Sequence, residues 1–185
     1  GKKVLYLNFS ICNGFCKSMG LEPDVDMGDL FYLLREDEEA LLAKLKRGIY
    51  PLGSYQIIPP PSNPEHYMEW RKGEVRHFLE ILLEKTDFEV LVLDMGCVMN
   101  GFFEVLDLCG RIWILKEHRT SKDSGIEELR ELLEKFKAGL EERVEEVFLP
   151  GGQAWREDGT IQVEEFYMGE VGNCVRRLLG GEYAS

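Results

Sequence analysis

The sequence lacks the features that place a protein in a membrane or on a nucleic acid. Its 185 residues contain no run of about 20 apolar residues and no secretory signal peptide, so we expect no membrane insertion. It also lacks a cluster of basic residues, because 34 acidic side chains outnumber 22 basic ones and give a formal net charge of -12. Such a surface repels phosphate, and direct nucleic-acid binding is therefore not expected.

The five cysteines are scattered and do not form a framework. Only Cys12 and Cys16 lie close together, in a C-x3-C spacing with no histidine nearby. This pattern has neither the ligand set of a zinc site nor the even number of thiols typical of a disulfide-rich domain. Free thiols in a reducing compartment are the simplest interpretation, and we predict a cytoplasmic protein.

What the sequence does contain is an alternation of strand-like and helix-like segments. Apolar runs predict strands over residues 3–9, 54–58, 89–94, 111–115 and 144–149. Helical periodicity lies between and after them, in residues 29–34, 38–47, 68–85, 101–108, 124–139 and 166–179. Strands joined by helices imply right-handed crossovers. We therefore expect an α/β fold, with a mostly parallel sheet and helices on both faces in three layers.

Polar residues follow the ends of two of these strands, where parallel sheets bind their ligands. Asp94 ends the most apolar strand and Gly96 comes two positions later, while Asn8 and Ser10 end the first strand. An acid placed like Asp94 is typical of a Walker B strand, which presents a carboxylate to magnesium, and the glycine lets the backbone approach the γ-phosphate. The same pattern also fits a cap or loop carboxylate without a ligand, so both interpretations stay open.

Four segments together resemble the ParA/MinD-type P-loop ATPase family in their order and spacing. GKKVLYLNF is similar to the second strand of that family, GSYQIIPPPSNPE to the next strand and its loop, and TDFEVLVLDMG to the Walker B segment. CGRIWILKEHRTSKDSGIEELRELL resembles the strand after it and the turn into a helix. The resemblance covers residues 1 to 150 and is closest to the atypical TadZ/CpaE-like branch, associated with pilus assembly and polar localisation. The tail FYMGEVGNCVRRLL also resembles that branch.

The sequence departs from the family at the phosphate-binding loop. No G-x-x-x-x-G-K-[ST] motif occurs, so the main-chain amides and the lysine that hold a triphosphate are missing. In the family this loop precedes the segment that begins at Gly1. We therefore expect a single domain over residues 1–185 that is truncated on its N-terminal side and lacks the P-loop strand. If the sheet closes the gap, the expected strand order is 54–58, 3–9, 89–94, 111–115, 144–149.

The resemblance, with these departures, implies a non-catalytic portion of a ParA/MinD-like protein that serves as a localisation or assembly scaffold. The nucleotide-binding positions that it carries over are Asp94, Gly96, Asn8 and Ser10. Asn8 and Ser10 stand where the family has acids, and an amide cannot act as a base, so no catalytic residue is expected. No cofactor is expected in this chain. In a parent protein with an intact P-loop, Asp94 would ligate magnesium and ATP would bind. The expected partners are proteins or further copies of the chain, since unpaired strand edges favour association.

Two alternatives remain open. In the first, the chain is part of an ATP-dependent dimerising ATPase switch whose P-loop lies upstream. A lysine-bearing upstream loop would favour this alternative, and a degenerate one would favour the scaffold. In the second, the chain is a receiver-like phospho-acceptor domain, which also places an acid at the end of a buried strand. A receiver needs an acidic pair after its first strand to hold magnesium, and Asn8, Phe9 and Ser10 occupy that position.

Overall fold

The computed structural model of the protein describes residues 2–10, 14–53, 55–96, 98–116, 124–148, 169–170 and 172–174. These residues fall into two compact units. Unit 1 contains the described residues up to Gly101, and unit 2 contains those from Phe102 onward. Each unit has its own hydrogen-bonded sheet.

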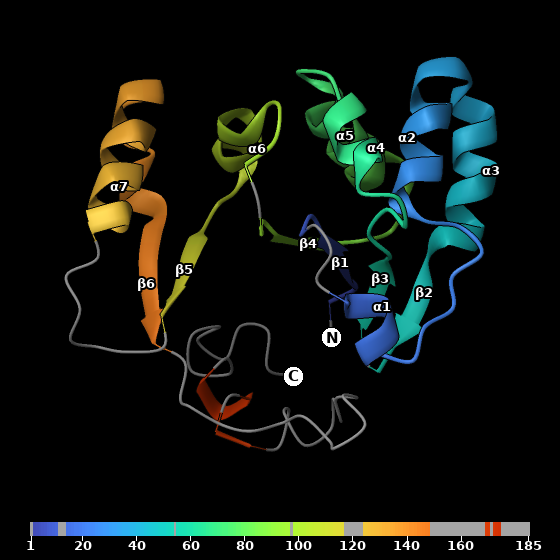
Figure 1. Ribbon diagram of the computed structural model, residues 1–185, viewed down its shortest axis with the longest axis horizontal. Coiled ribbons are helices and arrows are strands. Elements are labelled where there is room, and N and C mark those ends of the chain that lie inside the picture. The colour runs from blue at the N-terminus through green and yellow to red at the C-terminus, as the bar shows by residue number, and fades with distance from the viewer. Residues whose placement is uncertain are drawn as a thin grey trace. The chain divides into compact units, whose positions relative to one another are not determined.

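Unit 1 is built on a four-stranded sheet with the order β2–β3–β1–β4 (Figure 1). Its strands are β1 (Val4–Asn8), β2 (Tyr50–Leu52), β3 (Tyr55–Ile58) and β4 (Val90–Asp94). β1 pairs in parallel with both β3 and β4, whereas the short β2 is antiparallel to β3. The mostly parallel α/β fold predicted from the sequence is therefore confirmed.

The central strand β1 sends its side chains to two different environments, because successive residues of a strand point to opposite faces. Leu5, Leu7 and Phe9 on one face are completely buried. Four helices cover unit 1 on this side of the sheet (Figure 1), namely α2 (Met27–Glu36), α3 (Glu38–Gly48), α4 (Glu65–Glu69) and α5 (Glu74–Lys85). On the other face, the short α1 (Phe15–Ser18) places the ring of Phe15 on Tyr6, with centroids 5.5 Å apart. Helices thus contact both faces of the sheet.

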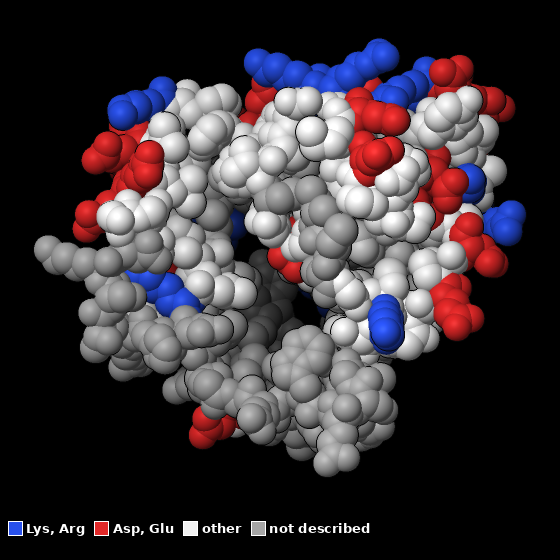
Figure 2. Space-filling view, viewed as in Figure 1, with Lys and Arg blue, Asp and Glu red and all other residues white. Residues whose placement is uncertain are grey.

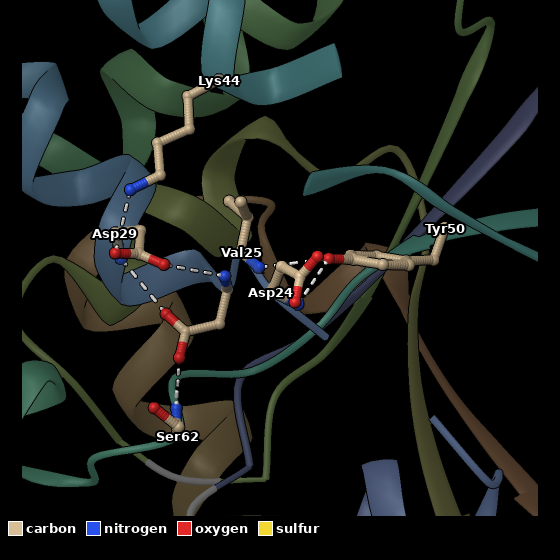
Figure 3. Close-up of polar contacts among 7 residues, drawn as sticks. Asp24, Val25, Asp29, Lys44, Tyr50 and Ser62 are labelled. Carbon is tan, nitrogen blue, oxygen red and sulfur yellow. Dashed lines mark hydrogen bonds and ion pairs between the residues drawn. The ribbon is translucent and has the colours of Figure 1, made fainter. Parts of the chain in front are cut away.

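Helix α2 begins at a capping box that also ties it to the loop after β3. Asp26 Oδ1 accepts a hydrogen bond from Asp29 N, and Asp29 Oδ2 accepts one from Asp26 N, both at 3.1 Å (Figure 3). Asp26 Oδ2 accepts from Ser62 N at 2.7 Å, so each oxygen of this buried carboxylate has a backbone partner. Lys44 of α3 donates to Asp29 at 3.0 Å. These contacts fix the start of α2 beside the carboxyl end of β3.

Unit 2 pairs β5 (Ile112–Lys116) with β6 (Val144–Phe148) in parallel. Its described helices include α6 (Phe102–Leu108) and α7 (Ser124–Phe136), and the short 3-10 turn η1 (Glu141–Arg143) follows α7. One small apolar core holds these elements together, formed by Leu106, Ile112, Leu133, Leu140 and Val144. The parallel neighbours 111–115 and 144–149 expected from the sequence are therefore present.

Two sequence predictions need correction. The helix predicted over residues 68–85 is in fact the pair α4 and α5, because Gly73 adopts a left-handed conformation with φ of 85° and starts a new helix. Strand β2 was not predicted, since it is three residues long with Pro51 at its centre. It lies at the edge of the sheet, where a residue without an N–H is tolerated.

Other sequence predictions are not tested by the structure. The helix over 166–179 lies largely outside the described residues, and the pairing of 89–94 with 111–115 would join the two units. The single domain over residues 1–185 likewise stays a prediction. No helix in the described part of the chain combines the length and the apolar composition needed to cross a membrane.

Candidate functional site

The structure brings together the four residues selected from the sequence at the carboxyl ends of β1 and β4. Asn8 lies opposite Asp94 in the parallel register, and Phe9 N donates to the Asp94 carbonyl oxygen at 2.8 Å. Ser10 and Gly96, two positions farther along each segment, also meet. A Cβ added to Gly96 would overlap Ser10 Oγ and lie 2.6 Å from Ser10 Cβ. The role of these residues in nucleotide binding stays a prediction.

The carboxylate of Asp94 is engaged by hydroxyl groups on both of its oxygens. Tyr6 Oη donates to Oδ2 at 2.6 Å, and Ser10 Oγ lies 3.5 Å from Oδ1. Tyr6 was not selected from the sequence. The signal for it is its position two residues before Asn8 on the same face of β1, which makes it a diagonal neighbour of Asp94 once the strands pair.

Aromatic rings pack around the Tyr6 phenol. Phe15 stacks on the ring, and Tyr55 of β3 meets it edge-on with centroids 6.4 Å apart. Burial raises the pKa of Tyr6 above its ordinary value of 10.0, and the hydrogen bond to Asp94 raises it further. The hydroxyl is therefore a permanent hydrogen-bond donor to the carboxylate at neutral pH.

Asn8 shapes the turn that follows β1. Its side chain is almost completely buried, with 1% of its surface exposed. Asn8 Oδ1 accepts from Ser10 N at 2.8 Å, Nδ2 lies 3.4 Å from Tyr6 Oη, and the Asn8 carbonyl accepts from Tyr67 Oη at 3.2 Å. The amide thus holds Ser10 close to Asp94 and begins a hydrogen-bond chain that runs through Tyr6 to the carboxylate.

ATP and magnesium are the ligands that the family resemblance implies, and the donor set here does not fit an independent site for them. Magnesium prefers an octahedral set of oxygens, usually carboxylates together with substrate phosphates. Asp94 is the single carboxylate of this cluster, and Tyr6 Oη donates to its Oδ2 while Ser10 Oγ lies 3.5 Å from Oδ1. Within the described ranges, no three or more His, Cys, Asp or Glu side chains converge to hold a metal ion. As the described residues form it, the cluster fixes two strand ends and offers a single carboxylate.

The basic and acidic side chains of the described residues are interspersed over the face shown in Figure 2. Ion pairs among the described residues include Arg76 with Glu80 at 2.9 Å and Lys44 with Asp29 at 3.0 Å. Mixed charge of this kind is the ordinary surface of a soluble helix face rather than a track for a nucleic-acid backbone. The expectation that the chain does not bind nucleic acid stays a prediction.

Solved structures with a similar fold include a ParA family ATPase from Chlorobium tepidum TLS. It is 14% identical in sequence, with a TM-score of 0.64, and the match covers 96% of this chain and 85% of that chain. Cobyrinic acid a,c-diamide synthase from Mycobacterium smegmatis, with bound ATP analog and magnesium, is 13% identical with a TM-score of 0.54. That match covers 99% of this chain and 71% of the synthase. The same synthase with bound ADP and magnesium is 12% identical with a TM-score of 0.53, over the same shares of the two chains.

Neither a protein-family model nor a curated protein matches the chain. At 12 to 14% identity, the likeness to solved structures concerns the arrangement of strands and helices. It agrees with the parallel order β3–β1–β4 and with helices on both faces of the sheet. The chain therefore has the α/β fold of ParA-like P-loop proteins.

Proposed function

We propose that the chain is the non-catalytic portion of a ParA/MinD-like, TadZ/CpaE-like protein that acts in the cytoplasm as a localisation or assembly scaffold. The observation that carries this proposal is the engagement of Asp94 by Tyr6 and Ser10. A Walker B carboxylate has to be offered to a magnesium ion. Here the neighbouring strand and its turn supply hydroxyl partners for it instead.

The replacement of acids by Asn8 and Ser10 supports the same function. Asn8 is buried, and its side-chain amide oxygen accepts a hydrogen bond from Ser10 N in the turn after β1. An amide does not take a proton from water, so Asn8 offers no catalytic base. Such a chain keeps the ParA-like fold and uses its strand ends for internal hydrogen bonds. It can therefore offer surfaces to protein partners without hydrolysing ATP. Polar localisation and pilus assembly are the processes that the TadZ/CpaE-like resemblance suggests for such a scaffold.

Calorimetric titration of the chain with ATP and magnesium tests the proposal. We expect no binding in the micromolar range, and Asp94→Asn should give the same result as the unchanged chain. Asp87→Asn is the matched control, because Asp87 is an exposed acid that pairs with Lys3 near the amino ends of β1 and β4, at the opposite edge of the sheet from Asp94. Micromolar binding that Asp94→Asn abolishes and Asp87→Asn preserves would overturn the scaffold proposal.

An ATP-dependent dimerising switch is the second candidate, and the placement of Asp94 at the end of β4 with Gly96 two positions beyond it favours it. The structural neighbour from Mycobacterium smegmatis was solved with an ATP analog and magnesium. In this alternative, a P-loop in a preceding segment of a longer protein would complete the site, and the dimer would form around ATP.

Sedimentation analysis of a protein that includes that preceding segment separates the two candidates. Dimerisation that requires ATP, together with ATP turnover, would support the switch. Self-association that is independent of nucleotide would support the scaffold. Within the unit 1 sheet, β4 is an end strand, and unpaired strand edges favour association with further strands.

A further inference from the structure

A shallow pocket lies between α2 and α4, on the side of the unit 1 sheet opposite to Tyr6. Its volume is about 200 Å³. Its floor includes Phe31 and Trp70, whose rings stack with centroids 4.1 Å apart and are almost completely buried. Trp70 also packs edge-on against Phe9 of the buried sheet face, at 5.7 Å. The pocket is therefore separate from the Asp94 cluster.

The size of the pocket limits what can occupy it. Sites for drug-sized molecules and cofactors usually measure about 300–1,000 Å³. A pocket of about 200 Å³ is below that range and has room for a single side chain rather than for a nucleotide. Tyr32 stands at the pocket with 65% of its surface exposed, and exposed aromatic residues of this kind are enriched at protein interfaces.

The cation in the wall of the pocket is already neutralised. Arg35 donates from Nε and Nη2 to the two carboxylate oxygens of Glu74, at 2.8 and 2.9 Å. The same Nη2 donates to the carbonyl oxygen of Glu69 at 2.8 Å. This fixed, paired guanidinium does not make the pocket attractive to anions.

The remaining charges make the pocket negative. Asp29 and Glu69 line it, and Asp29 is paired with Lys44 at 3.0 Å. The carboxylates in or beside the pocket are those of Asp29, Glu69 and Glu74. The cations are Arg35, which pairs with Glu74, and Lys44, which pairs with Asp29. The excess negative charge lies at Glu69, which lines the pocket and is exposed. A cationic group is therefore the complementary occupant.

His66 adds a buried ring nitrogen that has no partner among the described residues. Its imidazole occupies the space that a Cβ at Gly28 would fill, which is why the two helices approach closely there. His66 Nδ1 is buried and has no hydrogen-bond partner among the residues that the structure describes. An unpaired buried nitrogen gains from any rearrangement that gives it a partner, and an incoming N–H group is such a partner when the ring is neutral with the lone pair on Nδ1.

We propose that this pocket binds an arginine side chain of a protein partner. A guanidinium carries five N–H donors in a plane, so it can pair with the Glu69 carboxylate and supply a donor to His66 Nδ1. Its flat face can also stack on the exposed ring of Tyr32. Lysine has the same charge but lacks the plane, and a carboxylate would be repelled. The arginine site lies apart from the Asp94 cluster and does not depend on whether Asp94 binds nucleotide.

NMR titration of the whole chain with blocked arginine, N-acetyl-arginine amide, tests the proposal. We expect shifts in the signals of the Tyr32 ring and the Trp70 indole, with weaker binding of blocked lysine and no shifts with blocked glutamate. Glu69→Gln should weaken arginine binding about two- to fivefold, as expected for loss of an exposed ion pair. The matched control is Glu65→Gln, which removes an exposed charge of α4 that does not line the pocket.

Three outcomes would overturn the arginine site. The first is the absence of any shift at Tyr32 and Trp70, and the second is an equal response to the arginine, lysine and glutamate derivatives. The third is an equal effect of Glu69→Gln and Glu65→Gln, which would assign the binding to general surface charge. Because each readout is taken at α2 and α4, none of these outcomes bears on ATP binding at Asp94.

Discussion

Tyr6 Oη lies 2.6 Å from Asp94 Oδ2 and joins the ends of two parallel strands that are also paired through their backbones. The carboxylate at the end of β4 is thereby part of the internal hydrogen bonding of the sheet. The cluster around Asp94 therefore has a structural role, which can be measured as a contribution to the free energy of unfolding without any ligand.

Replacement of Tyr6 by phenylalanine should lower the free energy of unfolding by about 1–3 kcal/mol, because the change removes a donor to a partly buried carboxylate. Tyr55→Phe is the control, since Tyr55 lies on the same face without bonding to Asp94 and should cost less than about 1 kcal/mol. Urea denaturation at neutral pH measures both values. Equal losses in the two variants would contradict a specific contribution from the Tyr6–Asp94 bond.

The alkaline limb of the stability curve should also depend on Tyr6. In the unfolded chain a tyrosine ionises near its ordinary pKa of 10.0, whereas burial and then the bond to Asp94 raise the pKa of Tyr6 in the folded protein. The stabilisation from the neutral phenol is therefore complete below pH 10 and declines as the pH rises above it. Thermal unfolding across this range should show a shallower alkaline decline in Tyr6→Phe. Identical declines in the variant and the unchanged chain would exclude this linkage.

Gly96 should tolerate no side chain while Ser10 is present. The Cβ of Gly96→Ala would overlap Ser10 Oγ, and we expect a loss of about 1–3 kcal/mol from the forced shift. The double variant with Ser10→Gly removes the colliding atoms and should recover part of this loss. A double-mutant cycle by urea denaturation measures the coupling, and strictly additive effects would contradict contact between the two positions.

The candidate site was predictable from the sequence because its members follow strands that run in the same direction. Asn8, Ser10, Asp94 and Gly96 are adjacent in space since the carboxyl ends of parallel strands meet at one edge of a sheet. The alternation of apolar runs and helical periods was sufficient to predict a parallel sheet, and a parallel sheet places these residues at one edge.

The contacts of the site were not predictable, because they depend on register and on packing between distant segments. Tyr6 reaches Asp94 only when β1 and β4 align with Asn8 opposite Asp94, and a shift by one residue would turn the phenol to the other face. The pocket between α2 and α4 requires the break at Gly73, which the apolar period of 68–85 conceals. Local sequence carries little information about either feature.

Asp26 should matter more for stability than an ordinary helix cap. Asp26→Ala removes the cap of α2 and leaves Ser62 N without its 2.7 Å acceptor, so we expect a loss of about 2–4 kcal/mol. Asp37 caps α3 by accepting from Ala40 N at 3.0 Å but is exposed, and Asp37→Ala should cost about 0.5–1 kcal/mol. Urea denaturation of the two variants gives the comparison. A loss in Asp26→Ala no larger than that in Asp37→Ala would contradict the anchoring role of the second oxygen.

Acid should weaken unit 1 through the pairing of Glu74 with Arg35. The hydrogen bond from Arg35 lowers the pKa of Glu74 below its ordinary 4.5, against the opposing effect of burial. A carboxyl group with a lowered pKa stabilises the folded state above pH 4.5, and that contribution is lost as the pH falls below this value. Glu74→Gln should therefore cost about 1–2 kcal/mol at neutral pH and flatten the acid side of the stability curve.

Glu80→Gln is the matched control for Glu74→Gln, because Glu80 pairs with Arg76 on the open surface of the same helix and should contribute less than about 0.5 kcal/mol. Glu74 also accepts from Arg71 N at 2.8 Å, so the charged carboxylate holds the start of α5 as well as Arg35. Chemical denaturation at several pH values between about 3 and 7 measures both variants. If the free energy of unfolding depends on acid pH in the same way in Glu74→Gln and Glu80→Gln, protonation of Glu74 does not control the stability of unit 1 through the Arg35–Glu74 pair.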